Sequence, residues 1–121
     1  MLVYGSGSLG LCAVAILRAL YPDVAVAVVA RFEAQAELAR RFGAEKVMAH
    51  EPRLDIIEEV VAWGGGRLRQ PLQGLPMAYP GAIDIVYDTV GKPETFEVGV
   101  RVLTSRGTLV KAGVHAPGRW E

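Results

Sequence analysis

The sequence has few of the residues that mark secreted, metal-binding or nucleic-acid-binding proteins. It holds one cysteine and two histidines, and its 13 basic side chains are balanced by 13 acidic ones. A single cysteine excludes an intramolecular disulfide, and a formal net charge of zero offers no basic surface to nucleic acid or to an anionic membrane. The longest apolar run, Leu9–Leu20, contains Arg18 and is too short to cross a bilayer. We therefore expect a cytoplasmic protein with neither a nucleic-acid nor a membrane partner.

Length restricts the domain organisation. A chain of 121 residues forms one domain with a single core, so we expect residues 1–121 to be one folding unit. The cysteine, Cys12, falls in an apolar helical segment, and we expect it to be a small buried side chain rather than a nucleophile.

A glycine-rich turn follows the first strand. The apolar segment Met1–Tyr4 leads into the pattern GSGSLG and then into a helix rich in alanine and leucine. In this context Gly5 permits a tight turn, Gly7 lets the backbone approach a pyrophosphate, and Gly10 lets helix and strand pack closely. The amides at the start of a helix attract an anion. Those amides belong to Ser8, Leu9 and Gly10. The pattern predicts a dinucleotide-binding turn; the alternative is a glycine-rich turn that binds nothing.

Strand-like and helical segments alternate along the rest of the chain. Such alternation predicts an α/β fold with a doubly wound parallel sheet covered by helices on both faces, that is, three layers. The predicted strands are Met1–Tyr4, Val24–Ala30, Lys46–Ala49, Ala82–Asp88 and Thr108–Val114. The predicted helices after the first are Phe32–Phe42, Leu54–Trp63 and Pro93–Leu103. Between them, the Gly- and Pro-rich stretch 64–81 is expected to be a long surface loop.

Four blocks together resemble one family. They are LVYGSGSLG at 2–10, AELARRFGAEKV at 36–47, IDIVYDTVG at 83–91 and RGTLVKAGV at 106–114. In their order and spacing the chain resembles the nucleotide-binding domain of medium-chain, zinc-dependent alcohol dehydrogenases. The resemblance implies a Rossmann fold of about five strands in the order 3-2-1-4-5. It also implies a complete enzyme that transfers a hydride between NAD(P)(H) and an alcohol or carbonyl compound. A stand-alone nucleotide-sensing regulatory module without catalysis is the alternative.

Zinc ligands are scarce in this sequence. In the family, a separate catalytic domain supplies Cys and His ligands to zinc. Here Cys12, His50 and His115 are far apart, with no CxxC and no helical His pair, so they cannot build a closed zinc site. We therefore expect a domain excised or truncated from a larger dehydrogenase, inactive by itself, with zinc bound only by the missing domain if at all.

The resemblance also implies which residues contact the cofactor. The pyrophosphate would contact Gly7, Ser8 and Leu9. The adenosine half would be flanked by Thr89 and Val90. The nicotinamide carboxamide would lie beside Ala112, Gly113 and Val114. Each segment lies at or just beyond the carboxyl end of a predicted strand, where open parallel sheets form their binding crevice. We expect His115, the next residue, to be a solvated loop histidine rather than a substrate contact.

The end of the second strand departs from the NAD-binding pattern. NAD-binding relatives have an acidic residue there that accepts hydrogen bonds from the adenosine ribose, whereas this chain has Ala30 followed by Arg31. Without a carboxylate a 2′-phosphate is not repelled, and a guanidinium can pair with it. The sequence favours NADP over NAD. The alternative is that Arg31 stacks on the adenine without discriminating between the two cofactors.

The fifth predicted strand, Thr108–Val114, suggests self-association. In the family a sixth strand follows this one. Without that neighbour, the fifth strand would be an unprotected edge of the sheet. We expect a homo-oligomer.

Overall fold

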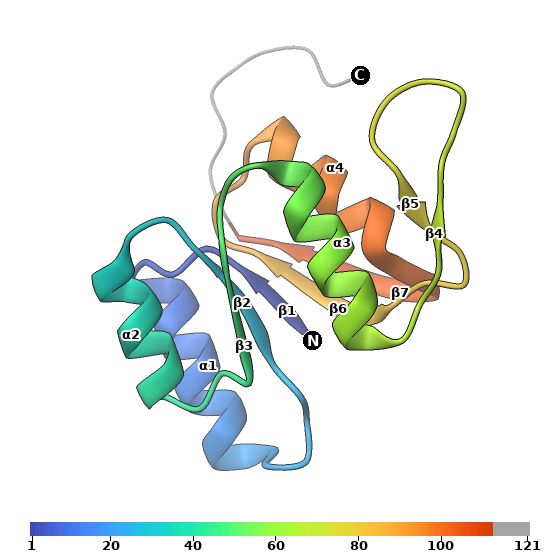
Figure 1. Ribbon diagram of the computed structural model, residues 1–121. Helices are drawn as coiled ribbons and strands as arrows, with labels where there is room; N and C mark the ends of the chain where they lie inside the picture. Colours follow the sequence, from blue (N-terminus) through green and yellow to red (C-terminus); the bar gives the residue numbers. More distant parts are fainter. Residues whose placement is uncertain (113–121) are drawn as a thin grey trace.

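The computed structural model describes residues 1–112, which form a five-stranded parallel sheet between two layers of helices (Figure 1). The strands of this sheet are β1 (Leu2–Tyr4), β2 (Ala27–Ala30), β3 (Lys46–Ala49), β6 (Ile83–Asp88) and β7 (Leu103–Lys111). They lie in the order β3-β2-β1-β6-β7, and all neighbouring pairs are parallel. Counted along the main sheet this is the order 3-2-1-4-5, so the predicted fold class and topology are confirmed.

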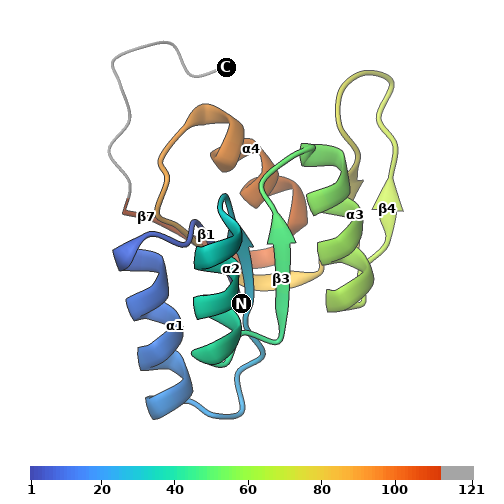
Figure 2. The same cartoon turned by 60° about the vertical axis from the view of Figure 1, so that its left-hand side comes forward.

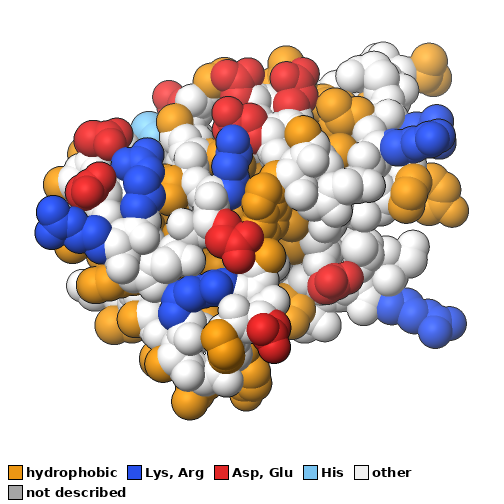
Figure 3. All heavy atoms as spheres, turned by 60° about the horizontal axis from the view of Figure 1, so that its bottom comes forward, with side chains coloured by type: hydrophobic (Ala, Val, Ile, Leu, Met, Phe, Trp, Pro, Cys, Tyr) orange, Lys and Arg blue, Asp and Glu red, His pale blue; other side chains and the backbone are white. Residues whose placement is uncertain are grey.

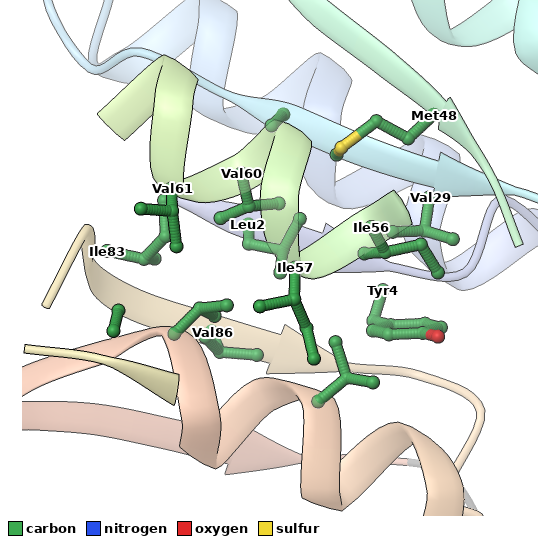
Figure 4. Packing of buried hydrophobic residues seen from close by; sticks show 14 residues of the cluster. Leu2, Tyr4, Val29, Met48, Ile56, Ile57, Val60, Val61, Ile83 and Val86 are labelled. Atoms are coloured by element: carbon green, nitrogen blue, oxygen red, sulfur yellow. The ribbon is translucent and has the colours of Figure 1, made fainter. Parts of the chain in front are cut away.

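Each face of the sheet is covered by a pair of helices (Figures 1 and 2). The helices α1 (Ser8–Leu20) and α2 (Glu33–Arg41) cover one face, and α3 (Arg53–Gly64) and α4 (Pro93–Val102) cover the other. Successive side chains of a strand point to opposite faces, and β1 shows this directly. Leu2 and Tyr4 belong to the apolar cluster under α3 and α4 (Figure 4). Val3 belongs to the cluster under α1.

The second strand is fully buried but shorter than predicted. All four residues of β2 are buried, as expected for a strand covered on both faces. Parallel pairing of β2 begins where Ala27 lies opposite Leu2, near the start of β1. Residues 24–26 lie outside the strand, although the carbonyl of Ala25 accepts from the Met1 amino group and that of Val26 from the Glu45 amide.

The stretch 64–81 is not the irregular surface loop that its composition predicts. It contains a small antiparallel hairpin of β4 (Leu68–Arg69) and β5 (Met77–Ala78), which lies beside α3 (Figure 2). Ala78 is 5% exposed and Leu75 packs against the core under α3 and α4. Strands of two residues carry too little periodicity to be recognised from sequence.

Two further predictions are wrong in detail. The last strand begins at Leu103 rather than Thr108, because α4 ends at Val102 and the chain enters β7 directly. The pairing of β7 with β6 is irregular at its start, where Arg106 has a positive φ of 66°. Cys12 is exposed rather than buried, since α1 turns Gly10 and Val14 toward the sheet and Cys12 away from it.

Candidate nucleotide-binding site

An open cleft of about 960 Å³ lies at the carboxyl ends of β1, β2, β3 and β6. Its walls come from four segments that are far apart in sequence: the glycine turn, the start of α2, the connection from β3 to α3, and the residues after β6. This is the edge of a doubly wound sheet where ligands bind.

The three glycines of the turn differ in what surrounds them. Gly5 has a positive φ of 113°, and a Cβ there would collide with Thr89 Oγ1. A Cβ on Gly10 would collide with the carbonyl oxygen of Gly5, so only glycine lets α1 approach the turn this closely. A Cβ on Gly7 would meet no protein atom within 4 Å. Gly5 and Gly10 are therefore required by the fold, whereas Gly7 borders open space.

Three backbone amides at the start of α1 lack acceptors. The first hydrogen bond of the helix runs from the amide of Leu11 to the carbonyl of Gly7, with an N–O distance of 3.0 Å. The preceding amides, which have no acceptor among residues 1–112, belong to Ser8, Leu9 and Gly10. Unpaired amides and the helix dipole together make this end of α1 attractive to an anion.

Hydrogen bonds hold the turn against the neighbouring segments. The Ser6 hydroxyl donates to Gln35 Oε1 of α2 over 2.8 Å. The Thr89 amide and hydroxyl both donate to the carbonyl of Tyr4, at 3.0 Å and 2.9 Å. Because the Thr89 hydroxyl is used in this way, the main role of Thr89 in the cleft wall is to connect the end of β6 to β1.

A buried carboxylate shapes the chain after β6. Asp88 is completely buried, and it accepts hydrogen bonds from the amides of Val90 and Gly91 at 3.0 Å and from the Thr95 hydroxyl at 2.9 Å. Its carbonyl accepts from the amide of Ala112 at 2.8 Å. These bonds place Val90 in the cleft and hold the end of β7 against β6. The remaining nicotinamide-side candidates, Gly113, Val114 and His115, lie outside the described residues.

The two residues that decide the predicted cofactor preference have different positions. Ala30 is 5% exposed and lines a smaller neighbouring hollow of about 110 Å³ rather than the cleft. Arg31 is exposed and lines both the cleft and this hollow. Its guanidinium lies 5.2 Å from the centroid of the Phe32 ring, within cation–π range. Within residues 1–112, Arg31 forms no ion pair.

Sequence reasoning missed several residues of the cleft. The connection 50–53 and Lys92 line it, and both follow the carboxyl ends of strands, which was the available signal. Arg53 is held by Glu97 of α4 at 3.2 Å. Lys92, in the described part of the chain, has no carboxylate partner, so it and Arg31 are cleft cations left free to meet a ligand.

The described residues contain no metal site and no membrane-spanning helix. Nowhere in residues 1–112 do three or more His, Cys, Asp or Glu side chains gather in a way that could hold a metal ion. No helix within the same range is both long and apolar enough to cross a membrane. On the face shown in Figure 3, basic and acidic side chains are interspersed among apolar ones.

Comparison with known proteins identifies the family. The model of the zinc-binding dehydrogenase family matches residues 8–119. The chain belongs to the zinc-binding dehydrogenase family. An alcohol dehydrogenase from Cupriavidus necator is 30% identical over 114 residues, which cover 94% of this chain and 27% of that protein. The chain thus spans little more than a quarter of this relative's length.

Solved structures of the family share the fold. Zinc-dependent alcohol dehydrogenase 2 from Streptococcus pneumonia, in its apo form, superposes with a TM-score of 0.76 at 25% identity, over 94% of this chain and 29% of that one. A zinc-binding dehydrogenase from Sinorhizobium meliloti 1021, bound to NADP, gives a TM-score of 0.72 at 24% identity, over 98% and 30%. An alcohol dehydrogenase from E. coli CFT073, complexed with NADH, gives 0.70 at 23% identity, over 96% and 29%. Both cofactors thus occur among structural neighbours.

Proposed function

We propose that the cleft binds the adenosine half of a dinucleotide, with NADP preferred over NAD. The chain then serves as the cofactor-binding domain of a zinc-type dehydrogenase. The full-length enzyme transfers a hydride between this cofactor and an alcohol or carbonyl substrate, whose pocket and zinc ligands belong to the catalytic domain.

The environment of the glycine turn carries this proposal. Gly7 borders open space, the amides of residues 8–10 are unpaired, and both lie in one cleft at the carboxyl ends of the strands. A pyrophosphate needs this combination of close backbone approach and convergent donors. The match to the dehydrogenase family weighs against a stand-alone regulatory module.

The cofactor preference rests on Arg31. Its side chain is exposed and has no acidic partner in the described chain. Arg31 comes directly after β2, which ends in Ala30 and not in an acidic residue. A charge-assisted contact to a 2′-phosphate contributes about 1.5 to 3 kcal/mol, or roughly ten- to a hundredfold in affinity. Arg31 lines both the cleft and the hollow beside Ala30. A 2′-phosphate bound in either place would therefore lie next to Arg31.

Calorimetric titration with NADPH and NADH tests the proposal. Replacing Arg31 by alanine should weaken NADPH roughly ten- to a hundredfold and leave NADH unchanged. Ala30→Asp should weaken NADPH and strengthen NADH, because a carboxylate repels the 2′-phosphate and accepts from the free ribose hydroxyls. The two changes act on one phosphate, so their effects should not simply add.

Arg67→Ala is the matched control, since Arg67 is an exposed arginine outside the cleft. It should change neither affinity. Equal binding of NADH and NADPH by the wild type, or equal weakening of both by Arg31→Ala, would show that Arg31 does not read a phosphate.

A further inference from the structure

The Tyr4 side chain at the end of β1 combines burial with an unused hydroxyl. The residue is 4% exposed, yet its hydroxyl has no hydrogen-bond partner in the described part of the chain. A buried tyrosine hydroxyl normally finds a partner. Among residues 1–112, the only fully buried side-chain nitrogen or oxygen atom without a hydrogen-bond partner is Arg18 Nε. The unpartnered Tyr4 oxygen is therefore not fully enclosed in the core. Tyr4 lines the cleft, so its hydroxyl opens there.

Packing in the apolar core fixes the position of the Tyr4 ring and thereby the direction of its hydroxyl. Tyr4 belongs to the apolar cluster that includes Val29 and Ile56. In Figure 4 its ring lies beside these two side chains, and the hydroxyl oxygen points away from Leu2 and Val86, toward the end of the sheet where the strands terminate. The backbone carbonyl of Tyr4 is also fixed, by Thr89. The Tyr4 hydroxyl is therefore a polar atom held in a set position in the cleft wall.

The charges around this atom indicate what it can bind. Burial, and next the carboxylate of Asp88, raise the pKa of Tyr4 to about 12; Glu51 and Glu94 act in the same direction and Arg53 opposes them. The hydroxyl is therefore neutral at physiological pH and can accept a hydrogen bond. Carboxylates predominate among the charges that act on this oxygen, which favours a ligand group that donates a hydrogen bond to it.

We propose that the Tyr4 hydroxyl recognises the adenine base by accepting a hydrogen bond from its exocyclic amino group. This inference rests on the proposed dinucleotide function and names a base contact within it. The amino group is the one donor on the adenine ring, since the unsubstituted ring nitrogens only accept. The glycine turn is assigned to the pyrophosphate and Arg31 to the 2′-phosphate, which leaves the part of the cleft at Tyr4 for the base.

The test compares two ligands and three proteins by calorimetric titration. The ligands are NADPH and the analogue in which hydrogen replaces the 6-amino group of adenine. The wild type should bind NADPH about three- to tenfold more tightly than the analogue, as expected for one hydrogen bond. Tyr4→Phe should bind NADPH only as tightly as the analogue and should bind the analogue with unchanged affinity.

Tyr87→Phe is the matched control. Tyr87 pairs in register with Val3, whose side chain faces α1, so it lies on the opposite face of the sheet from Tyr4. This variant should keep the preference of the wild type. Thermal unfolding of Tyr4→Phe should match the wild type, because the hydroxyl has no partner in residues 1–112 to lose.

Either of two results would overturn the assignment of Tyr4 and leave the proposed dinucleotide function standing. One is equal binding of both ligands by the wild type; the other is an equal change for both ligands in Tyr4→Phe, which would indicate altered ring packing. Absence of NADPH and NADH binding by a folded wild-type protein would instead overturn the proposed function and the base contact with it.

Discussion

Gly7 and Gly10 lie three residues apart in the same turn, and the same substitution at each should have opposite effects. In Gly7→Val the new side chain enters the space assigned to the pyrophosphate and touches no protein atom within 4 Å at its Cβ. In Gly10→Val the Cβ would collide with the carbonyl of Gly5, with the carbonyl carbon at 2.9 Å. The first change should therefore act on binding and the second on the fold.

The magnitudes follow from the local structure. Gly7 is the N-cap of α1 with an ordinary φ of −72°, so a side chain there causes no backbone strain. A poor N-cap costs about 0.5 to 1 kcal/mol, and restricting the unfolded chain gains about 0.4 to 1 kcal/mol. The free energy of unfolding of Gly7→Val should thus stay within about 1 kcal/mol of the wild type. Overpacking at Gly10 should cost about 1 to 3 kcal/mol or more.

The effect of Gly7→Val should appear in NADPH affinity and not in stability. Loss of two charge-assisted amide–phosphate contacts corresponds to about 3 to 6 kcal/mol, or roughly 100- to 10,000-fold in NADPH affinity. Urea unfolding measures the stability of both variants, and calorimetric titration measures NADPH affinity of Gly7→Val. A folded Gly7→Val protein that binds NADPH as tightly as the wild type would refute the assignment of the glycine turn as the phosphate site.

Two further predictions concern stability and association. Because the pKa of Tyr4 is raised from 10.0 to about 12, its contribution to stability should be complete below about pH 10 and lost as the pH rises through about 12. Urea unfolding between these pH values should show a steeper loss for the wild type than for Tyr4→Phe, and parallel losses would contradict it. The strand β7 lies at one edge of the sheet, so we expect a dimer or larger oligomer at high concentration. A monomer by light scattering at millimolar concentration would count against this.

The fold could be predicted because its signals are local and repeated. Strands such as β2 are unbroken apolar runs, and helices such as α3 end at glycine, where Gly65 adopts a positive φ of 83°. The hairpin of β4 and β5 could not be predicted, because strands of two residues have no periodicity and are held by tertiary contacts of Leu75 and Ala78. The exposure of Cys12 depends on which side of α1 meets the sheet, and an apolar helix does not reveal this.

Sequence motifs and the family resemblance marked part of the cleft, since the glycine turn, Arg31, Thr89 and Val90 all line it. The glycine turn is contiguous, so residues 5–10 could be assigned from sequence. Lys92 and the connection 50–53 reach the cleft through topology, because β3 and β6 end at the same edge of the sheet as β1. Tyr4 was assigned to a strand, but nothing in a single strand tells whether the end of a buried ring meets the core or a cleft.

The walls of the cleft are fixed by the protein itself, and this determines how ligand-binding variants can be interpreted. Ser6 joins the glycine turn to α2, Thr89 joins β6 to β1, and Ala112 joins the end of β7 to Asp88. Each bond connects segments at least 24 residues apart, and none involves Gly7 or Arg31. A protein that arranges its donors before the ligand arrives avoids the entropic cost of ordering them. Affinity lost in Gly7→Val or Arg31→Ala therefore measures a contact with the cofactor, because the bonds that hold the cleft open remain in place.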